Sequence, residues 1–533
     1  MDEKEIMQAI SQGVVSLGIE FGSTRIKAVL IDLNHTPIAS GSHTWENSLE
    51  DGIWTYSLDA VWFGVRQAYA ELAKEVKEKF ALPLTKIEAI GISAMMHGYL
   101  PFDAQGKQLA PFRTWRNTIT EDAANLLTKA FAFHIPQRWS IAHLYQAILN
   151  GEPHAENIAH LTTLSGYVHW RLTGRQVIGA GEASGMFPLN DHTGNYDETM
   201  LHTFNSLAAQ KNMPWKLQDI LPKALRAGEN GGTLTEEGAR LLDESGVLQP
   251  GALMCPPEGD AGTGMVATNS IAPRTGNISA GTSIFAMVVL EKSLEKVHTE
   301  IDLVTTPDGL PVAMVHCNTC TSDLDAWVRL FEDVMKGMGI AYTRDALYEA
   351  VYRAALAGDA DCGGLLSYNY YGGEPIAGFD EGRPLFVRLP DSKLSLSNFS
   401  RSMLYSAMAT LKIGMDILMQ NEHVPIEKMM GHGGFFKTKG VGQQLMAGAL
   451  NVPIEVMESA GEGGAWGIAL LASFAKRRQA NESLVDYLNH SVFGNLQSDC
   501  MHPQQTDIDG FSAYLQRYRE GLPIEKAAIA CLK

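Results

Sequence analysis

Two segments of the chain share one pattern: an apolar run, a short glycine turn and a second apolar run. They are residues 14–32, VVSLGIEFGSTRIKAVLID, and residues 277–290, NISAGTSIFAMVVL. The pattern predicts two strands joined by a tight turn, and successive backbone N–H groups in such a turn can bind an anion. Two hairpins of this kind indicate a duplicated fold that closes on one nucleotide; two unrelated hairpins are the alternative. The turns are Gly22-Ser23-Thr24 in the first segment and Gly281-Thr282-Ser283 in the second.

Helical spacing of apolar residues follows the first hairpin. Between residues 57 and 80, Val61, Val65 and Tyr69 begin an apolar stripe of helical period, and Ser57 or Asp59 is the expected N-cap. Further helices are predicted over residues 323–336, 400–420 and 442–450, and the last forty or so residues are expected to form a helical extension with an exposed tail.

Two stretches near predicted strands carry candidate binding residues. Residues 86–93, KIEAIGIS, form a predicted strand that leads into Met96-His97-Gly98, and open α/β sheets bind ligands at such strand ends. A single histidine is more often structural, so the strand end alone does not establish a site. The glycines of residues 430–434, MGHGG, would let the backbone lie flat against a planar ring, although helix caps and turns are the commoner use of such glycines.

Asp260 is the candidate acid of the chain. It lies within residues 259–264, GDAGTG, where small neighbours leave its carboxylate accessible and allow a helix to begin directly after it. Residues 111–119, PFRTWRNTI, combine an aromatic, two arginines and an asparagine, which suits the rim of a sugar site and equally suits a solvated connector.

Composition narrows the class of protein. At 533 residues the chain has room for about three ordinary domains or two large ones, and 45% of its residues are hydrophobic and 19% charged. The net charge of −18 disfavours nucleic acid as a partner, and the longest apolar run, near residues 465–475, is too short to cross a bilayer. The acidic N-terminus resembles neither a secretory signal nor a transit peptide, so we expect a cytoplasmic protein that does not bind membranes.

Several common site motifs are missing from the sequence. No Walker A motif, kinase H-R-D or D-F-G, H-E-x-x-H or nucleophile elbow with a triad occurs. Two glycine-rich segments, GAGEASG at 179–185 and GEGGAWG at 461–467, lack the spacing of a dinucleotide loop. The six cysteines are sparse, and the pair Cys317-x-x-Cys320 is expected to be two buried thiols without a disulfide or zinc.

Taken in order, these motifs resemble those of sugar kinases of the FGGY type, in particular its pentulose kinases. The resemblance extends from Gly18 to Ala469, most of the chain. It implies an α/β fold of two actin-like, ribonuclease-H-like domains, residues 1–268 and 269–533, with ATP and sugar meeting in the cleft between them.

The resemblance also assigns roles to residues. Asp260 matches the catalytic base that takes the proton from the sugar hydroxyl, and it would share Mg²⁺ with Glu20. The expected sugar contacts are Met96, His97, Gly98, Trp115, Asn117 and Asp260. The expected ATP contacts are Gly22, Ser23 and Thr24 in one hairpin, Gly281, Thr282 and Ser283 in the other, and Gly433, Gly434 and Lys437 at the adenosine.

Three positions depart from the family pattern. Glu20 stands where the family has Asp, which displaces the carboxylate by more than about 1 Å. The family's W-x-D-x-R is Trp115-Arg116-Asn117-Thr118-Ile119 here, which puts the identity of the sugar in doubt. Its Ala-Asp pair after the adenosine loop is Ala447-Gly448, a smaller change.

Two hypotheses follow for the function. The first is an ATP- and Mg²⁺-dependent kinase that converts D-xylulose or L-ribulose to the 5-phosphate, with hexuloses and polyols as further substrates to consider. The second is a non-catalytic ATP-binding sensor in which Glu20 marks lost metal chemistry; Asp260 argues against it. A chaperone-like ATPase lacks a recognisable partner-binding domain, and the oligomeric state, a homodimer included, stays open.

Overall fold

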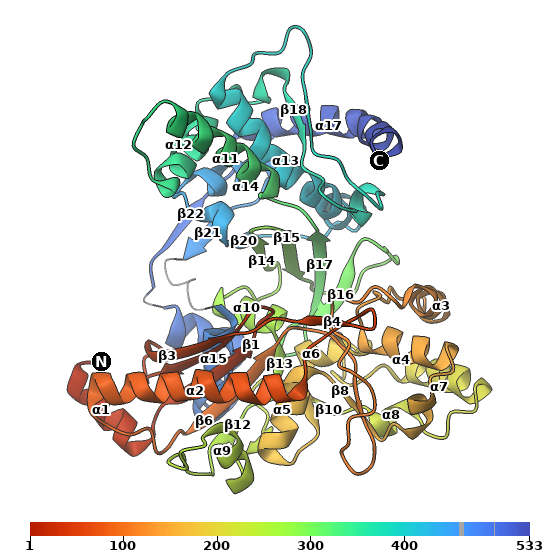
Figure 1. Ribbon diagram of the computed structural model, residues 1–533, viewed down its shortest axis with the longest axis vertical. Coiled ribbons are helices and arrows are strands. Elements are labelled where there is room, and N and C mark those ends of the chain that lie inside the picture. The colour runs from red at the N-terminus through yellow and green to blue at the C-terminus, as the bar shows by residue number, and fades with distance from the viewer. Residues whose placement is uncertain (458–462, 495) are drawn as a thin grey trace. The chain divides into compact units, whose positions relative to one another are not determined.

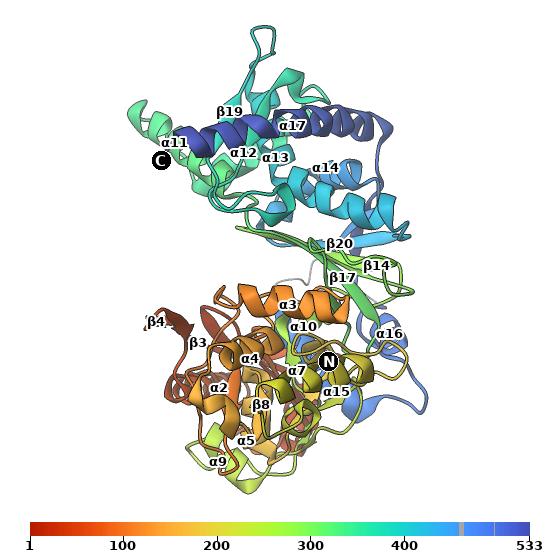
Figure 2. The ribbon, with the colours of Figure 1, turned by 90° about the vertical axis from the view of Figure 1, so that its right-hand side faces the viewer.

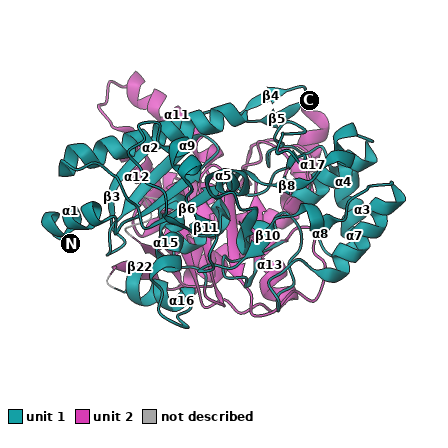
Figure 3. Ribbon diagram, turned by 90° about the horizontal axis from the view of Figure 1, so that it is seen from below, with its two compact units in different colours: residues 1–271, 303–312, 461–495 teal, residues 272–302, 313–460, 496–533 magenta. Residues whose placement is uncertain are grey.

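The computed structural model describes residues 1–457, 463–494 and 496–533. The chain forms two compact units, coloured separately in Figure 3. Unit 1 comprises residues 1–271, 303–312 and 461–495, and unit 2 comprises residues 272–302, 313–460 and 496–533. The chain therefore returns to unit 1 twice after residue 271.

Unit 1 is built on a mixed seven-stranded sheet of order β11-β12-β6-β1-β2-β3, with β13 also paired to β6 (Figure 1). Strand β1 runs antiparallel to β2 and parallel to β6, and β6 runs parallel to β12 and β13. The strands are β1 (Ser16–Phe21), β2 (Arg25–Ile31), β3 (Pro37–Thr44), β6 (Ala89–Ala94), β11 (Gly232–Thr233), β12 (Leu253–Met254) and β13 (Glu258–Gly259). Three small two-stranded sheets pair β4 (Ser48–Glu50) with β5 (Ile53–Thr55), β7 (Leu100–Phe102) with β8 (His160–Thr162) and β9 (Val177–Gly179) with β10 (Lys223–Leu225).

Helices cover both faces of this sheet, which explains why β1 is a nearly continuous apolar run. On one face, α2 approaches β3 so closely that a Cβ at Gly41 would lie 2.1 Å from the carbonyl oxygen of Ala68. On the other face, α15 approaches β1, and a Cβ at Gly18 would lie 2.0 Å from the carbonyl oxygen of Ala465. Gly18 pairs with Val29 and Gly41 with Ala28, so the two glycines face opposite sides of the sheet. The helices of unit 1 are α1 (Glu3–Gln12), α2 (Leu58–Phe80), α3 (Glu121–Phe131), α4 (Ser140–Leu149), α5 (Leu164–Thr173), α6 (Ala180–Ser184), α7 (Glu198–Gln210), α8 (Leu217–Ile220), α9 (Glu236–Leu242), α10 (Asp260–Ala267), α15 (Gly463–Arg477) and α16 (Leu484–Tyr487).

The second sheet repeats the centre of the first. Its order is β16-β17-β15-β14-β20-β21-β22, and β14 runs antiparallel to β15 and parallel to β20. Strand β14 therefore has the same pairing pattern as β1, with one antiparallel and one parallel neighbour. The strands are β14 (Thr275–Ala280), β15 (Ile284–Val289), β16 (Asp302–Thr305), β17 (Pro311–Cys317), β20 (Lys428–His432), β21 (Ile454–Met457) and β22 (Ser498–Met501), and β18 (Leu366–Tyr368) pairs with β19 (Leu385–Val387) apart from this sheet.

The long helices of unit 2 gather on one side of this sheet (Figure 2). The buried helix α13 meets β17 at Gly414, where a Cβ would lie 2.3 Å from Cγ1 of Val315. A salt bridge buried between α13 and α17, Arg401 with Asp507, fixes the C-terminal helix. The helices of unit 2 are α11 (Ser322–Gly337), α12 (Arg344–Leu356), α13 (Leu396–Asp416), α14 (Val441–Leu450) and α17 (Gln505–Cys531).

Most of the predicted elements are confirmed, with differences at their ends. Both hairpins form, and α2 begins after the predicted cap Ser57, whose hydroxyl accepts the N–H of Ala60. Helix α13 begins four residues before the predicted position because Ser395 caps it. The predicted helical extension is α17, but β22, which sequence analysis missed, precedes it. The six cysteines are free thiols, and Cys317 and Cys320 are buried as expected.

Across the described parts of the chain, no helix combines the length and apolar character needed to cross a membrane.

Candidate functional site

The first hairpin turn is held from behind through its carbonyl oxygens. The indole N–H of Trp45 donates to Gly22 (2.7 Å), the hydroxyl of Tyr56 donates to Ser23 (2.6 Å), and the backbone N–H of Trp45 donates to Thr24 (3.1 Å). The two aromatic rings stack with centroids 4.1 Å apart. Because a peptide is planar and trans, carbonyls that point inward turn the following N–H groups outward. The exposed tip thus presents N–H groups to a ligand.

The second hairpin turn is held in the same sense by different groups. Cys320 donates its N–H to the carbonyl of Thr282 (2.8 Å), and Thr321 donates both its N–H (3.2 Å) and its hydroxyl (2.9 Å) to the carbonyl of Gly281. A Cβ at Gly281 would meet nothing within 4 Å, so the tip is open. The outward N–H groups again suit an anion such as phosphate.

Glu20 lies on β1 directly before the first turn, and the N-terminus of α15 approaches its carboxylate. Oε2 accepts the N–H of Ala465 at 3.2 Å, and a Cβ at Gly464 would lie 2.2 Å from Oε1. Burial, followed by the charge of Asp260, raises the pKa of Glu20 to about 7, while the Ala465 N–H lowers it. Sequence analysis tested residues 461–467 only for dinucleotide spacing and so missed Gly464 and Ala465; residues 461 and 462 lie outside the described part of the chain.

Asp260 is the first residue of α10, as the small residues around it predict. Its Oδ1 accepts the N–H of Met96 at 3.0 Å, and the positive end of the helix dipole favours a carboxylate there. The side chain is accessible to solvent, yet the protein around it raises its pKa by desolvation, an effect that backbone N–H groups partly offset. Accessibility decides whether a substrate can reach the carboxylate, and the surrounding protein decides its basicity.

The turn after β6 continues from Met96, which bonds to this carboxylate, through His97 and Gly98. His97 has φ +71° and Gly98 has φ +116°, a sharp left-handed turn of the kind often found at functional sites. The His97 ring is buried, lies parallel to the Trp139 ring at 6.2 Å and has Nδ1 3.3 Å from the carbonyl oxygen of Gly185. The structure therefore places Met96 and His97 together with Asp260 and Glu20 in unit 1.

Two buried acids that sequence analysis did not identify, Glu182 and Glu258, lie near the accessible Asp260. Glu258 accepts the N–H groups of Gly181 (3.3 Å) and Glu182 (2.9 Å), and burial raises its pKa to about 8. Burial, assisted by the charges of Asp260 and Glu258, also raises the pKa of Glu182. The glycine-rich segment 179–185, set aside for its wrong dinucleotide spacing, was the available signal.

The Trp115 loop divides into an exposed and an internal part. Trp115 is 42% exposed, whereas Asn117 is buried. The amide of Asn117 accepts the N–H of Trp54 (2.8 Å) and donates to the carbonyl oxygens of Trp54 (2.9 Å) and Thr114 (3.0 Å). The guanidinium of Arg116 stacks over the Trp54 ring at 3.8 Å. Asn117 thus fixes the loop from inside, and Trp115 is its accessible side chain.

The two glycines of the predicted adenosine loop differ. Gly433 has φ +97°, and a Cβ there would lie 2.4 Å from the carbonyl oxygen of Ala280, so the packing of β20 against β14 requires glycine. A Cβ at Gly434 would meet nothing within 4 Å, so this position is open.

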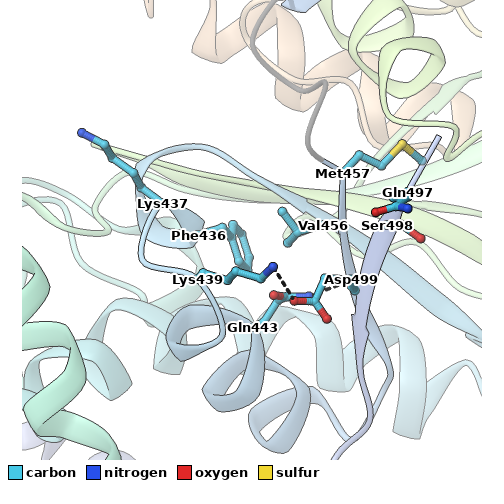
Figure 4. A pocket seen from close by; sticks show the side chains of 9 residues that line it. All are labelled: Phe436, Lys437, Lys439, Gln443, Val456, Met457, Gln497, Ser498 and Asp499. Carbon is cyan, nitrogen blue, oxygen red and sulfur yellow. Dashed lines mark hydrogen bonds and ion pairs between the residues drawn. The ribbon is translucent and has the colours of Figure 1, made fainter.

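A pocket of about 430 Å³ lies beside the residues that follow this loop, lined by Phe436, Gln443 and Val456 among others (Figure 4). Lys437 points away from the other labelled side chains, and its Nζ lies 3.1 Å from Oδ1 of Asp345 in an exposed pair. The structure thus places the predicted adenosine glycines and Lys437 in unit 2, with the second hairpin.

Among residues 1–457, 463–494 and 496–533, no group of three or more His, Cys, Asp or Glu side chains is arranged to hold a metal ion. A pair of carboxylates remains, Glu20 and Asp260. Two hard oxygen donors suit Mg²⁺, which is commonly held by one or two carboxylates together with substrate phosphates.

Family models match both parts of the chain. The N-terminal domain of the FGGY family of carbohydrate kinases matches residues 15–247, and its C-terminal domain matches residues 276–476. Xylulose kinase of Haemophilus influenzae is 21% identical over 527 residues, which cover 94% of this chain and 98% of that protein.

Solved structures show the same fold. A ligand-bound xylulose kinase from Lactobacillus acidophilus is similar with a TM-score of 0.77 at 20% identity, covering 97% of this chain and 98% of that one. Gluconate kinase from Lactobacillus acidophilus is similar with a TM-score of 0.76, also at 20% identity and with the same coverage of both chains. The two family matches together span most of the chain, and the two mixed sheets agree with them. The protein is therefore a member of the FGGY family of carbohydrate kinases, which phosphorylate their substrates with ATP.

Proposed function

We propose that the acceptor of this kinase is a ketopentose, D-xylulose or L-ribulose, and that the product is the 5-phosphate. The observation that carries the proposal is the accessible carboxylate of Asp260 at the start of α10, hydrogen-bonded to Met96 beside His97. A relative named xylulose kinase matches nearly the whole chain, and the Met96-His97-Gly98 turn agrees with that activity. The altered Trp115 loop keeps L-ribulose as the second candidate.

The acidic surroundings of Asp260 favour an uncharged acceptor. Burial raises the pKa of Glu20 to about 7 and that of Glu258 to about 8, and it raises the pKa of Glu182 as well, so the surroundings favour neutral groups over negative charge. A carboxylate on the substrate would be disfavoured there, because the same desolvation acts on its charge and because it would repel ionised Asp260. This supports a neutral sugar over the sugar acid named for the gluconate kinase of similar fold.

Asp260 acts as the general base in the proposed reaction. It takes the proton of the terminal hydroxyl as that oxygen attacks the γ-phosphorus of ATP, the bond from phosphorus to the β-phosphate oxygen breaks, and ADP leaves. A raised pKa makes the carboxylate a better base, and the Met96 N–H holds it in place. His97 and Trp115 bind the sugar, while Asn117 supports the Trp115 loop.

The remaining site residues bind ATP and metal. The turns Gly22-Ser23-Thr24 and Gly281-Thr282-Ser283 bind phosphates through their N–H groups, and Gly433 and Gly434 border the adenosine, with Lys437 near them. Glu20 and Asp260 would hold Mg²⁺: the charge of Asp260 raises the pKa of Glu20 when no cation is present, and a cation between them would offset that repulsion. Mg²⁺ held there would supply positive charge to neutralise the charge that develops on the phosphates.

The roles of the two parts of the chain follow from these residues. The N-terminal part carries the sugar site, the first hairpin and the base, and the C-terminal part carries the second hairpin and the adenosine loop. A non-catalytic sensor of the same fold is the alternative, and the retained Asp260 argues against it, because binding alone needs no base.

The test is an ADP-release assay with Mg-ATP against ketoses, aldoses, polyols and sugar acids. We expect one strong response, to D-xylulose or L-ribulose, and none to gluconate. A strong response to another acceptor alone would reject the ketopentose assignment. Silence across the panel, with ATP still bound, would favour the sensor.

A further inference from the structure

A buried carboxylate in unit 2 has no part in the function proposed above. Glu374 lies between β18 and β19 and is 0% exposed. Burial raises its pKa to about 7, and the backbone N–H groups of Asn318, Ile376 and Thr319 lower it. A buried carboxylate held mainly by backbone N–H groups fixes the segment that supplies them.

The segment that Glu374 holds begins directly after β17. Its carboxylate accepts the N–H of Asn318 at 2.8 Å, and the Asn318 amide donates to the carbonyl of Gly373 at 2.6 Å. A third bond, 2.8 Å long, joins the amide of Asn369 to the carbonyl of Cys320. Residues 318–320 are thus tied to the loop around Glu374 from one side.

The other side of the same segment holds the second hairpin. Cys320 and Thr321 donate to the carbonyl oxygens of Thr282 and Gly281, the bonds that turn the tip N–H groups outward. The bonds to Glu374 and to the hairpin all come from one segment of four residues, 318–321. A shift of Asn318 would therefore be transmitted to the tip.

We propose that Glu374 is a positioning residue for nucleotide binding, which aligns the Gly281-Thr282-Ser283 turn through residues 318–321 without touching the ligand. This inference rests on the proposed role of that turn in binding the phosphates of ATP. With its pKa raised to about 7, the carboxyl of Glu374 is ionised at pH 8, where its charge strengthens the bonds that it accepts from N–H groups and where binding is to be measured.

The experiment compares Glu374→Gln with Glu525→Gln. Glu525 is likewise 0% exposed and accepts a backbone N–H, that of Arg383 at 2.6 Å, but it lies on α17 and does not bond to the hairpin segment. Dissociation constants for ADP and ATP come from calorimetry, and KM for ATP and for the sugar from kinetics. For Glu374→Gln we expect nucleotide affinity to fall about tenfold with the sugar KM unchanged, since bonds to charged groups are the stronger ones. Glu525→Gln should change nucleotide affinity less than twofold.

Asn318→Ala provides a second variant that should fold, because Asn318 is exposed. It removes the bond to Gly373 and should weaken nucleotide binding about threefold, the loss of one ordinary hydrogen bond. The inference is overturned if Glu374→Gln and Asn318→Ala both bind ADP within twofold of the parent. It is also overturned if Glu374→Gln and Glu525→Gln lower thermal stability and both substrate affinities alike, because the effect would then be structural.

Gly281→Val separates this inference from the proposed function. The position has room for a side chain within the protein, so the fold should persist while a ligand at the tip is obstructed. Normal nucleotide affinity in Gly281→Val would reject the phosphate role of the turn itself. A large loss in Gly281→Val with normal binding in Glu374→Gln would reject only the role of Glu374.

Discussion

The two hairpins of this kinase have the same backbone arrangement but different chemistry. In each, the central strand lies between an antiparallel and a parallel neighbour, and inward carbonyls leave the N–H groups of the turn outward. Two residues before the turn glycine, however, unit 1 has Glu20 and unit 2 has Ser279. Their partners on the parallel strands are Ser93 and His432. The anion-binding geometry is present in both units, whereas the acidic chemistry is found only in unit 1 at these positions.

The supports behind the turns differ as well. The first turn is held mainly by the stacked side chains of Trp45 and Tyr56, with one backbone N–H, and the second mainly by backbone N–H groups before α11, with the hydroxyl of Thr321. The same orientation of carbonyls can thus be reached with side chains or with backbone. What the duplication preserves is the direction of the N–H groups.

The largest expected effect concerns the acid that unit 1 carries. Asp260→Asn should bind ATP but lose sugar phosphorylation by about 10²–10⁴, because a positioned general base contributes that much to the rate. Coupled kinetics and calorimetry measure the two properties. Asp197→Asn is the matched control, since Asp197 caps α7 of unit 1 and accepts the N–H of Met200 at 2.9 Å. Activity of Asp260→Asn within about tenfold of the parent would reject the assignment.

Unit 1 also contains buried histidines, and one of them, His169, allows the pH dependence of folding stability to be tested. Burial lowers its pKa to about 4 from 6.5, and its Nε2 lies 2.9 Å from the carbonyl oxygen of Gly231. Below pH 6.5 the unfolded chain binds the proton and the folded one does not, so the stabilisation by neutral His169 is lost as the pH falls toward 4. The loss is about 1.4 kcal/mol per pH unit.

The stability difference between the parent and His169→Gln should therefore shrink between pH 6.5 and 4. Denaturant unfolding of unit 1, followed by hydrogen exchange of its peptides, measures it. His202→Gln on the exposed face of α7 is the control and should show a constant difference. A constant difference for His169→Gln as well would contradict a neutral buried imidazole.

Glu20 and Ser279 allow the units to be compared at equivalent positions. Glu20→Gln should raise the Mg²⁺ concentration needed for half-maximal activity about tenfold. This is the lower end of the range of affinity lost when an interaction with a charged group is removed. Ser279→Ala should leave it unchanged. Titration of Mg²⁺ at saturating ATP measures both, and equal responses would remove the chemical asymmetry of the hairpins.

The smallest effects concern the supports of the turns. Tyr56→Phe removes the hydroxyl that donates to the carbonyl oxygen of Ser23. The loss of this one hydrogen bond should raise KM for ATP about threefold. Thr321→Val should have less effect because the N–H of Thr321 still binds Gly281. The reverse order would show that the hydroxyl of Thr321 contributes more to the second turn than the hydroxyl of Tyr56 contributes to the first.

The central elements were predictable because their signals are local. An apolar run with a glycine turn specifies a hairpin, Ser57 specifies a helix start, and the small residues around Asp260 specify another. The contact of Ala465 with Glu20 joins positions 445 residues apart, and the glycines at 461–467 matched no known loop spacing. The internal bonds of Asn117 were hidden for the same reason, since its partner Trp54 lies on a separate hairpin.

The return of residues 461–495 to unit 1 affects how the protein can be made. Helix α15 (Gly463–Arg477) covers the face of β1 (Ser16–Phe21) that carries Gly18, yet the two elements lie far apart in the sequence. During translation that face of the first sheet stays uncovered until residue 477 has left the ribosome. A fragment that stops before residue 461 would expose the same apolar surface permanently. Until α15 has been made, this apolar surface of unit 1 is therefore open to association with other chains.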